Sequence, residues 1–152
     1  MYQKNKLTGC RLLNGLRILI LDELECLNAL TYLLEVEGAS VIGFSSVAKV
    51  VNKLKFQSVD IMLINLKIIK KYALAKQIKV CDVKIPKQIP KIGVADSHCN
   101  LDWASIRDLG CYDHLSTGFN SDQIVHSILC NIEQDCFFQQ LEKITIAIRN
   151  HL

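Results

Sequence analysis

Three polar residues that could do chemistry stand at the ends of apolar runs. Asp22 and Glu23 follow the run Arg17–Leu21, and Asn65 lies near the end of the run at residues 59–66. Apolar runs of this length are typical of strands buried in a parallel sheet. Ligands of such sheets bind just beyond the carboxyl ends of the strands. We therefore expect the three side chains near one edge of a sheet.

Cation binding is the chemistry that these groups could share. Asp22, Glu23 and Asp96 could form one acidic pocket without a neutralising lysine, and Asn65 could add its carbonyl oxygen. Such a set suits Mg²⁺ or Ca²⁺, because hard cations prefer oxygen ligands. The alternative is a solvated acidic remnant, since Mg²⁺ binds weakly where no phosphate shares it. The sequence leaves both open.

Enzymatic chemistry has no matching pattern. The sequence contains no glycine-rich phosphate loop, no nucleophile elbow and no acid–base pair at a useful spacing. Asp113 and His114 are adjacent in a predicted strand, so they would point to opposite faces of the sheet. We expect that the protein is not an enzyme. We also expect no cofactor, apart from the weak Mg²⁺ or Ca²⁺ site left open above.

The elements that would hold these residues alternate along the chain. Apolar runs predict strands, and apolar residues three and four positions apart predict helices. The predicted strands span residues 17–21, 40–44, 59–66, 90–95 and 111–115. The predicted helices span residues 24–36, 47–56, 68–80, about 100–109 and 121–133. Five strand–helix repeats with short connections predict a parallel sheet with helices on both faces.

Polar residues mark several expected helix ends. Ser121 would cap the last of these helices, and either Asn100 or Asp102 would cap the one before it. No clear cap precedes the helix at residues 68–80. Residues 82–89 are predicted to form a polar connection.

The last residues, 134–152, exceed what one such domain at residues 16–133 needs, and residues 1–15 precede it as a lead-in. The tail is predicted to form an amphipathic helix of about two heptads. Its apolar residues recur at spacings of four, three and four: Phe137, Leu141, Ile144 and Ile148. This helix could fold back on its own domain, form a dimer seam, or connect to a further domain of a longer protein.

Composition narrows the classes of partner. The net charge of +3 is uneven, with eight lysines and one acid between Lys67 and Lys91. A lysine run with one aromatic residue and no arginine is more typical of a solvated face than of a nucleic-acid site. No run reaches the about 18 apolar residues of a membrane helix, and no signal peptide is evident. Seven cysteines without a CxxC pair indicate free thiols in a reducing cytosol, so we expect a cytoplasmic protein.

Three segments, in the right order and spacing, resemble the receiver domain of response regulators in two-component signalling. Residues 16–23 are similar to the family's first strand with its terminal acidic pair. Residues 60–66 are similar to its phosphoacceptor strand, and residues 109–119 to its fifth strand and the following loop. The resemblance covers residues 16–133. It implies a doubly wound (βα)5 parallel sheet of flavodoxin or receiver type, with strand order 2-1-3-4-5 and an extra C-terminal helix.

The resemblance also implies roles for the polar residues. Asp22 and Glu23 keep the acidic pair that holds a divalent cation in the family. Lys67 stands where a backbone carbonyl completes the metal shell. Asn65 replaces the phosphoacceptor aspartate. A carboxamide is neutral and a very poor nucleophile, so it cannot form an acyl phosphate.

Two further positions of the family's site are changed. Ala95 stands where the family has a hydroxyl residue, and Thr117 replaces the lysine that neutralises the phosphoryl charge. His114 occupies the aromatic switch position. We therefore expect a phosphorylation-independent pseudo-receiver that acts as a protein-interaction or dimerisation module in signal transduction.

The expected partner is a protein of a signalling pathway, or a second copy bound through the face of the fourth and fifth helices or through the tail. Trp103, on the fourth helix, is either partly buried locally or an exposed anchor. The predicted contact residues are Trp103, His114, Phe137, Leu141, Ile144 and Ile148. The alternative function is a small-molecule or divalent-metal sensor that uses Asp22, Glu23, Asn65 and Lys67. A flavodoxin-like enzyme is disfavoured, because the acidic first turn would repel a phosphate.

Overall fold

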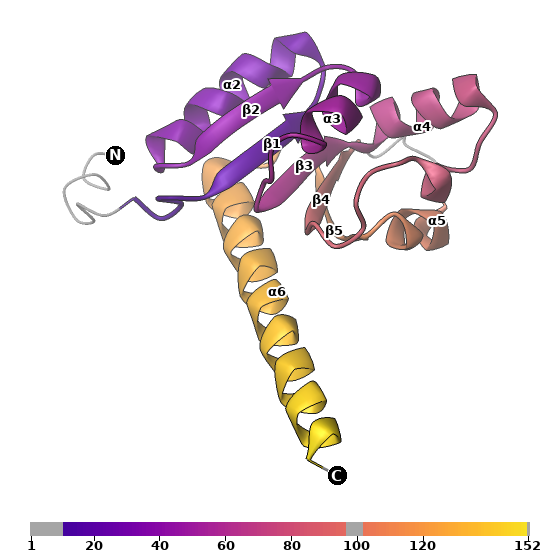
Figure 1. Ribbon diagram of the computed structural model, residues 1–152. Helices are drawn as coiled ribbons and strands as arrows, with labels where there is room; N and C mark the ends of the chain where they lie inside the picture. The colour runs from indigo at the N-terminus through magenta and orange to yellow at the C-terminus, as the bar shows by residue number, and fades with distance from the viewer. Residues whose placement is uncertain (1–10, 97–101, 152) are drawn as a thin grey trace.

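One parallel sheet lies at the centre of the computed structural model, which describes residues 11–96 and 102–151. Its strands are β1 (Arg17–Leu21), β2 (Ser40–Phe44), β3 (Ile61–Asn65), β4 (Lys91–Ala95) and β5 (Cys111–Ser116). All neighbouring strands are parallel, and their order is β2-β1-β3-β4-β5 (Figure 1). The predicted doubly wound sheet and its strand order are confirmed.

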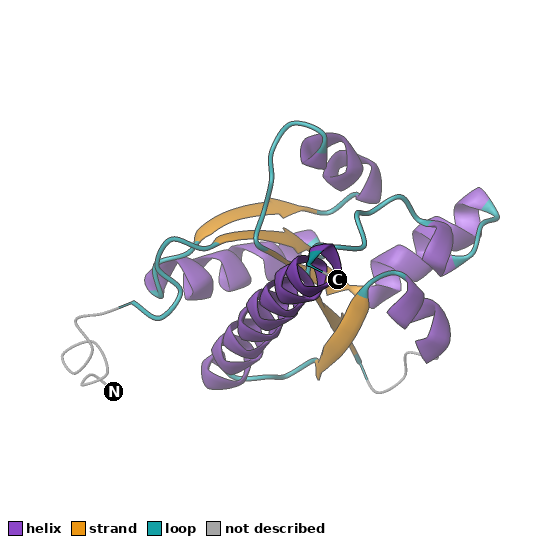
Figure 2. Ribbon diagram, turned by 60° about the horizontal axis from the view of Figure 1, so that its bottom comes forward, coloured by secondary structure: helices purple, strands orange, loops and turns teal. Residues whose placement is uncertain are grey.

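Helices cover both faces of the sheet (Figure 2). They are α2 (Leu24–Val36), α3 (Val47–Leu54), α4 (Leu66–Lys76), the 3₁₀ helix η1 (Val80–Asp82), α5 (Trp103–Asp108) and α6 (Ser121–Asn150). Because successive strand residues point to opposite faces, the apolar strands contribute to two cores. Ile20 and Leu63 pack with α2 and α6 on one face, whereas Met62 and Ile64 pack with α3 and α4 on the other.

The helix after β3 begins earlier than predicted. It starts at Leu66 rather than Ile68, and it ends at Lys76. Asn65 is both the last residue of β3 and the N-cap of α4, where its Oδ1 accepts a hydrogen bond from the backbone N–H of Lys67 at 2.9 Å. The cap was missed because it lies inside the apolar run that predicts the strand.

The start of α6 also differs from the prediction. Asn120, not Ser121, is the N-cap. Its side chain accepts from the backbone N–H of Gln123, and the Gln123 side chain accepts from the backbone N–H of Asn120, both at 2.8 Å. A residue pair spaced by three makes this reciprocal capping box possible, which a lone serine at position 121 cannot do. Of the two caps considered for α5, Asp102 is used, and Asn100 lies outside the described residues.

The connection before β4 is less polar in structure than in sequence. Val83 and Ile85 are buried against the core that contains Met62. Lys91, the last residue of the lysine run, is buried with 1% of its surface exposed, so the run is not a solvated face throughout. Where β5 pairs with β4, Lys91 lies opposite Cys111 and Ile92 opposite Asp113. This shift leaves Tyr112 as the extra residue of a β-bulge.

The tail is helical, as predicted, and it continues α6 without a break. α6 is a single helix of 30 residues. Its first half packs on the sheet through Ile124 and Ile128, and Asp113 of β5 accepts hydrogen bonds from Ser127 Oγ at 2.7 Å and Asn131 Nδ2 at 3.0 Å. Its second half stands clear of the sheet, beyond the amino ends of the strands (Figure 1). Within the described chain, no helix is both long and apolar enough to cross a membrane.

Candidate functional site

Asp22 and Asn65 meet at the carboxyl edge of the sheet. Asn65 Nδ2 donates a hydrogen bond to Asp22 Oδ1 at 2.9 Å, and the backbone N–H of Glu23 donates to the same oxygen at 2.7 Å. Asp22 is 5% exposed, whereas Asn65 and Glu23 are half-buried. The pairing of β1 with β3, in which Leu21 lies opposite Ile64, brings the two side chains together. The sequence correctly predicted that these residues share one edge.

The amide of Asn65 is used at both of its ends. Its nitrogen bridges to the Asp22 carboxylate, and its oxygen caps α4 through the backbone N–H of Lys67. An amide supplies both a donor and an acceptor, which an ionised carboxylate cannot do. Together with the backbone N–H of Glu23, the Asn65 amide gives the buried Asp22 carboxylate two hydrogen-bond donors. A buried charge without such donors would be costly.

The predicted cation ligands do not form a suitable set. Lys67 is the second residue of α4, and a helical carbonyl points along the helix toward the N–H four residues ahead. Its carbonyl is therefore directed away from the sheet edge. Asp96 is exposed, and residues 11–96 and 102–151 contain no group of three or more Asp, Glu, His or Cys side chains able to hold a metal. Of the two alternatives that the sequence left open for Asp22, Glu23 and Asp96, the geometry of the described residues offers no donor set that fits octahedral Mg²⁺.

Ala95 and Thr117 also lie at this edge, as the resemblance implies. The backbone N–H of Thr117 donates to the carbonyl of Ala95 at 3.1 Å. Ala95 is half-buried and presents a methyl group, and Thr117 is exposed in the turn where Gly118 has φ +92°. These two positions thus offer neither a hydroxyl at residue 95 nor a cation at residue 117.

Trp103 and His114 form a second feature, on α5 and β5. Their ring centroids are 4.7 Å apart, with the ring planes tilted by 43°. Trp103 is 44% exposed, so it is neither fully buried nor free of local contacts. The two rings line a pocket of about 290 Å³ together with Arg107, Cys111, Tyr112 and Asp113. The structure brings together two of the predicted contact residues.

The apolar stripe of the tail faces away from the domain. Phe137, Leu141, Ile144 and Ile148 are between 43% and 58% exposed. With 3.6 residues per turn, they lie on nearly the opposite side of α6 from Ile124 and Ile128, which pack on the sheet. The tail therefore does not fold back on its own domain.

A charged pair closes the opposite, amino edge of the sheet. Arg17 Nη2 lies 3.1 Å from Asp60 Oδ1, and Asp60 Oδ2 accepts from the backbone N–H of Arg17 at 2.7 Å. The hydrogen bonds from Arg17 lower the pKa of Asp60 below its usual value. This pair joins the start of β1 to the residue before β3.

Comparison with known proteins identifies the fold. No protein-family model and no curated protein matches the sequence. The structure is similar to the receiver domain of the sensor histidine kinase PA1611 from Pseudomonas aeruginosa, crystallised with magnesium in its active-site cleft. The TM-score is 0.61 at 15% identity, over 78% of this chain and 98% of that chain. A CheY-like receiver domain protein from Methanospirillum hungatei gives a TM-score of 0.60 at 16% identity, over 78% of this chain and 94% of that one.

A longer protein matches more of this chain. NtrX from Brucella abortus, in complex with ATP, gives a TM-score of 0.63 at 15% identity over 85% of this chain. The match covers only 29% of the NtrX chain. Identities this low show the fold alone, and the chain has the fold of a response-regulator receiver domain.

Proposed function

We propose that this protein is a phosphorylation-independent pseudo-receiver of a signalling pathway, which acts by binding a protein partner or a second copy of itself. The observation that supports this most directly is the double use of the Asn65 amide. Its nitrogen holds Asp22 and its oxygen caps α4. Phosphoryl transfer to a receiver needs a free carboxylate oxygen at this place, and the chain has neither the carboxylate nor a free oxygen there.

The surroundings of Asn65 support the same conclusion. Phosphoryl chemistry depends on groups that stabilise developing negative charge, such as a metal ion or a lysine. Thr117 stands at the lysine position and is exposed, and Lys67 points its carbonyl along α4. A phosphoryl group at position 65 would lie beside the Asp22 carboxylate, without a lysine at position 117 and without a metal ion held by the carbonyl of residue 67.

An experiment with a small phosphodonor tests the proposal. The protein is incubated with acetyl phosphate and Mg²⁺ and then examined by intact-mass spectrometry. A receiver domain that carries the phosphoacceptor aspartate serves as the positive control. We expect the control to gain a phosphoryl group and this protein to gain none. A stable phosphoryl adduct on this protein would refute the proposal.

The tail supports a second copy as the binding partner. Its stripe of Phe137, Leu141, Ile144 and Ile148 has the spacing of a coiled-coil seam and faces away from the domain. Two heptads form a marginal helix when isolated, because nucleating a helix is costly. Here the packed first half of α6 supplies the nucleus, so the tail only has to propagate it. This removes the main objection to a short seam.

The cation-sensing alternative has less support from the geometry. Asp22 Oδ1 accepts two N–H donors, and Asn65 Oδ1 is occupied by the cap of α4. We expect the melting temperature of the wild-type protein to be the same with and without millimolar Mg²⁺ or Ca²⁺. An increase that disappears in Asp22→Ala would favour the sensor instead.

A further inference from the structure

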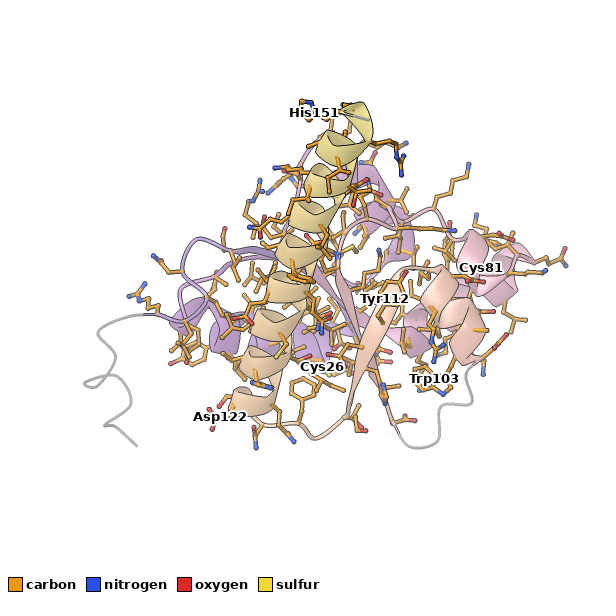
Figure 3. All side chains as sticks on the ribbon, turned by 90° about the horizontal axis from the view of Figure 1, so that it is seen from below. Cys26, Cys81, Trp103, Tyr112, Asp122 and His151 are labelled. Carbon is orange, nitrogen blue, oxygen red and sulfur yellow. The ribbon has the colours of Figure 1, made fainter. Side chains whose placement is uncertain are left out.

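A pocket of about 430 Å³ lies between the starts of β4 and β5 and the middle of α6. It is at the amino edge of the sheet, opposite the edge that carries Asp22 and Asn65. Its walls come from the loop before β4, the bulge of β5 and the part of α6 that leaves the domain. They include Lys87, Lys91, Gly110, Tyr112, Asn131 and Asp135. Figure 3 shows Tyr112 on β5, between the ribbons of α6 and α5 in that view. The volume is within the range of small-molecule sites, about 300–1,000 Å³.

Lys91, one of the lining residues of this pocket, has a buried side chain. Lys91 is 1% exposed, and its Nζ donates to the carbonyls of Pro86 at 2.5 Å and Ile89 at 2.8 Å. An ammonium has three N–H donors, so one remains beyond these two. The pocket wall at Gly110 adjoins the nitrogen, because a Cβ built on Gly110 would lie 3.0 Å from Lys91 Nζ and 2.6 Å from the carbonyl oxygen of Lys87. Gly110 therefore packs closely against Lys91 Nζ and the Lys87 backbone, and a side chain here would displace one of them.

The charge of Lys91 has no counterion in the part of the chain that the structure describes. Among the described residues, no carboxylate forms an ion pair with Lys91. Buried charges are normally paired, because removing a lone charge from water is costly. The cost is visible in the pKa of Lys91, which burial lowers to about 8. An anion in the pocket would supply the missing counter-charge.

The lining limits the class of anion. Lys87 and Lys91 bring two positive charges, and Asp135 brings one negative charge, so a ligand with a single negative charge balances the set. Pro90, Gly110 and the ring of Tyr112 give the pocket an apolar wall. Asn131 and Gln134 add amide groups from α6, although Asn131 Nδ2 is already bonded to Asp113. Monocarboxylates with an apolar body fit this combination.

We propose that this pocket binds a small organic monocarboxylate, whose carboxylate pairs with the buried ammonium of Lys91 and whose apolar body lies against Pro90 and Tyr112. The ligand would contact β4, β5 and α6 together, at the point where α6 departs from the sheet. This binding site does not involve Asp22, Asn65 or any other residue of the opposite edge. It would remain if the pseudo-receiver proposal failed.

A titration with 2-naphthoate tests the site, with 2-naphthamide as a neutral ligand of nearly the same shape. Backbone amide signals of Gly110, Tyr112 and Asn131 are followed by two-dimensional NMR. We expect these signals to shift with 2-naphthoate, and its affinity to exceed that of 2-naphthamide by tenfold or more. No shift up to 10 mM 2-naphthoate, or equal affinity for the two compounds, would overturn the proposal.

Two variants locate the charge that the ligand uses. Lys91→Met should weaken 2-naphthoate binding at least tenfold, whereas the exposed Lys84→Met should leave it unchanged as the matched control. Lys91→Met also removes the donors to Pro86 and Ile89, so its fold is checked from the same spectra. Lys87→Glu leaves those bonds intact and should weaken binding severalfold by reversing a charge at the pocket. Undiminished binding in the Lys87 variant, together with undiminished binding in a folded Lys91 variant, would refute the site.

The pH dependence gives a further readout. The carboxylate of 2-naphthoate stays ionised above neutral pH, so weaker binding between pH 7 and pH 9.5 would report deprotonation of Lys91. The other titratable groups around Nζ are Lys87, Cys111, Tyr112 and Asp135. Burial raises the pKa of Cys111 to about 11, so its thiol stays neutral over most of this range. Affinity for 2-naphthoate that is flat up to pH 9.5 would contradict the assignment to Lys91.

Discussion

Asn65 Nδ2 donates to Asp22 Oδ1 at 2.9 Å, so the residue that ends β3 is hydrogen-bonded to the residue that follows β1. The Asn65 amide helps to hold the elements together at the carboxyl edge of the sheet. It joins the end of β1 to the end of β3 and also starts α4. The Asn65 side chain therefore has a structural role, which has measurable consequences for stability.

Replacing Asn65 by Ala should destabilise the fold by about 1–2 kcal/mol, since both a helix cap and a hydrogen bond to a buried carboxylate are lost. Urea unfolding followed by circular dichroism measures the change. Asn52→Ala, an exposed substitution inside α3, is the matched control and should be close to neutral. Equal losses in the two variants would mean that the cap and the bridge contribute nothing.

Replacing Asn65 by Asp should introduce a carboxylate at the end of β3 that destabilises the fold. The new carboxylate would face Asp22 at hydrogen-bonding distance, and two like charges this close repel each other. We expect a lower melting temperature at pH 7, partly recovered by Mg²⁺ or by lowering the pH to 4.5. The wild-type protein should show no Mg²⁺ effect. A variant as stable as the wild type in the absence of Mg²⁺ would contradict this account of the edge.

The seam of α6 predicts a homodimer that depends on one side of the helix. Leu141→Glu should convert the dimer to a monomer in light scattering, with the dissociation constant raised at least tenfold, about 1.4 kcal/mol. Ile146 is 48% exposed on the same part of the helix but lies on the other side, away from Leu141. Ile146→Glu should therefore leave the dimer intact. A wild-type protein that is monomeric at 100 μM, or a dimer lost equally in both variants, would exclude this seam.

The direction of the two helices can be tested with the protein's own cysteines. Cys130 lies seven residues before Phe137, so it continues the seam, whereas Cys136 is adjacent to Phe137 and points elsewhere. Both thiols are free, and Cys130 is half-exposed. If the dimer is parallel and in register, mild oxidation with diamide should link Cys130 to its copy. Cys130→Ser should abolish the linked dimer and Cys136→Ser should not; the reverse pattern would contradict a parallel seam.

The ion pair of Arg17 and Asp60 should account for part of the loss of folding stability at low pH. The pKa of Asp60 is lower in the folded protein than in the unfolded chain, because Arg17 hydrogen-bonds to its ionised form. Its contribution to stability is therefore fully present above the unfolded pKa, about 4, and is lost as the pH falls through the lower folded pKa. Asp60→Asn should destabilise at pH 7 by no more than about 1 kcal/mol, because the pair is largely solvated. The gap to wild type in urea unfolding should close below pH 3, and a gap independent of pH would argue against the pair.

Much of the fold was predictable because buried positions are occupied by apolar residues, and their spacing along the sequence differs between strands and helices. The bounds of β1, α2 and β2 agree residue for residue with the predicted spans 17–21, 24–36 and 40–44. In these elements, apolar residues follow the period of the strand or helix, and the ends carry no competing signal. Parallel strands with helical crossovers leave few alternative arrangements, so the topology follows from the order of the elements.

The features that were missed depend on contacts between distant residues. Asn65 was predicted to be a changed site residue, but its role as a cap required knowing that α4 begins without a loop. Lys91 was counted with the solvated lysines, because its burial depends on the carbonyls of Pro86 and Ile89 and on the closeness of β5. The pocket beside it combines residues from β5 and α6, which no local pattern brings together. The bulge at Tyr112 could not be inferred from a strand of six residues with alternating burial.

Because α6 is one unbroken helix, its two halves move as one body. Residues 134–150 extend about 25 Å beyond the anchored part, at 1.5 Å per residue. A tilt of about 10° at the hydrogen bonds from Ser127 and Asn131 to Asp113 would displace the far end by roughly 5 Å. The helix can therefore act as a rigid arm that pivots where it is hydrogen-bonded to Asp113 of β5. Small rearrangements at the sheet would be magnified along it, with no hinge needed to transmit them.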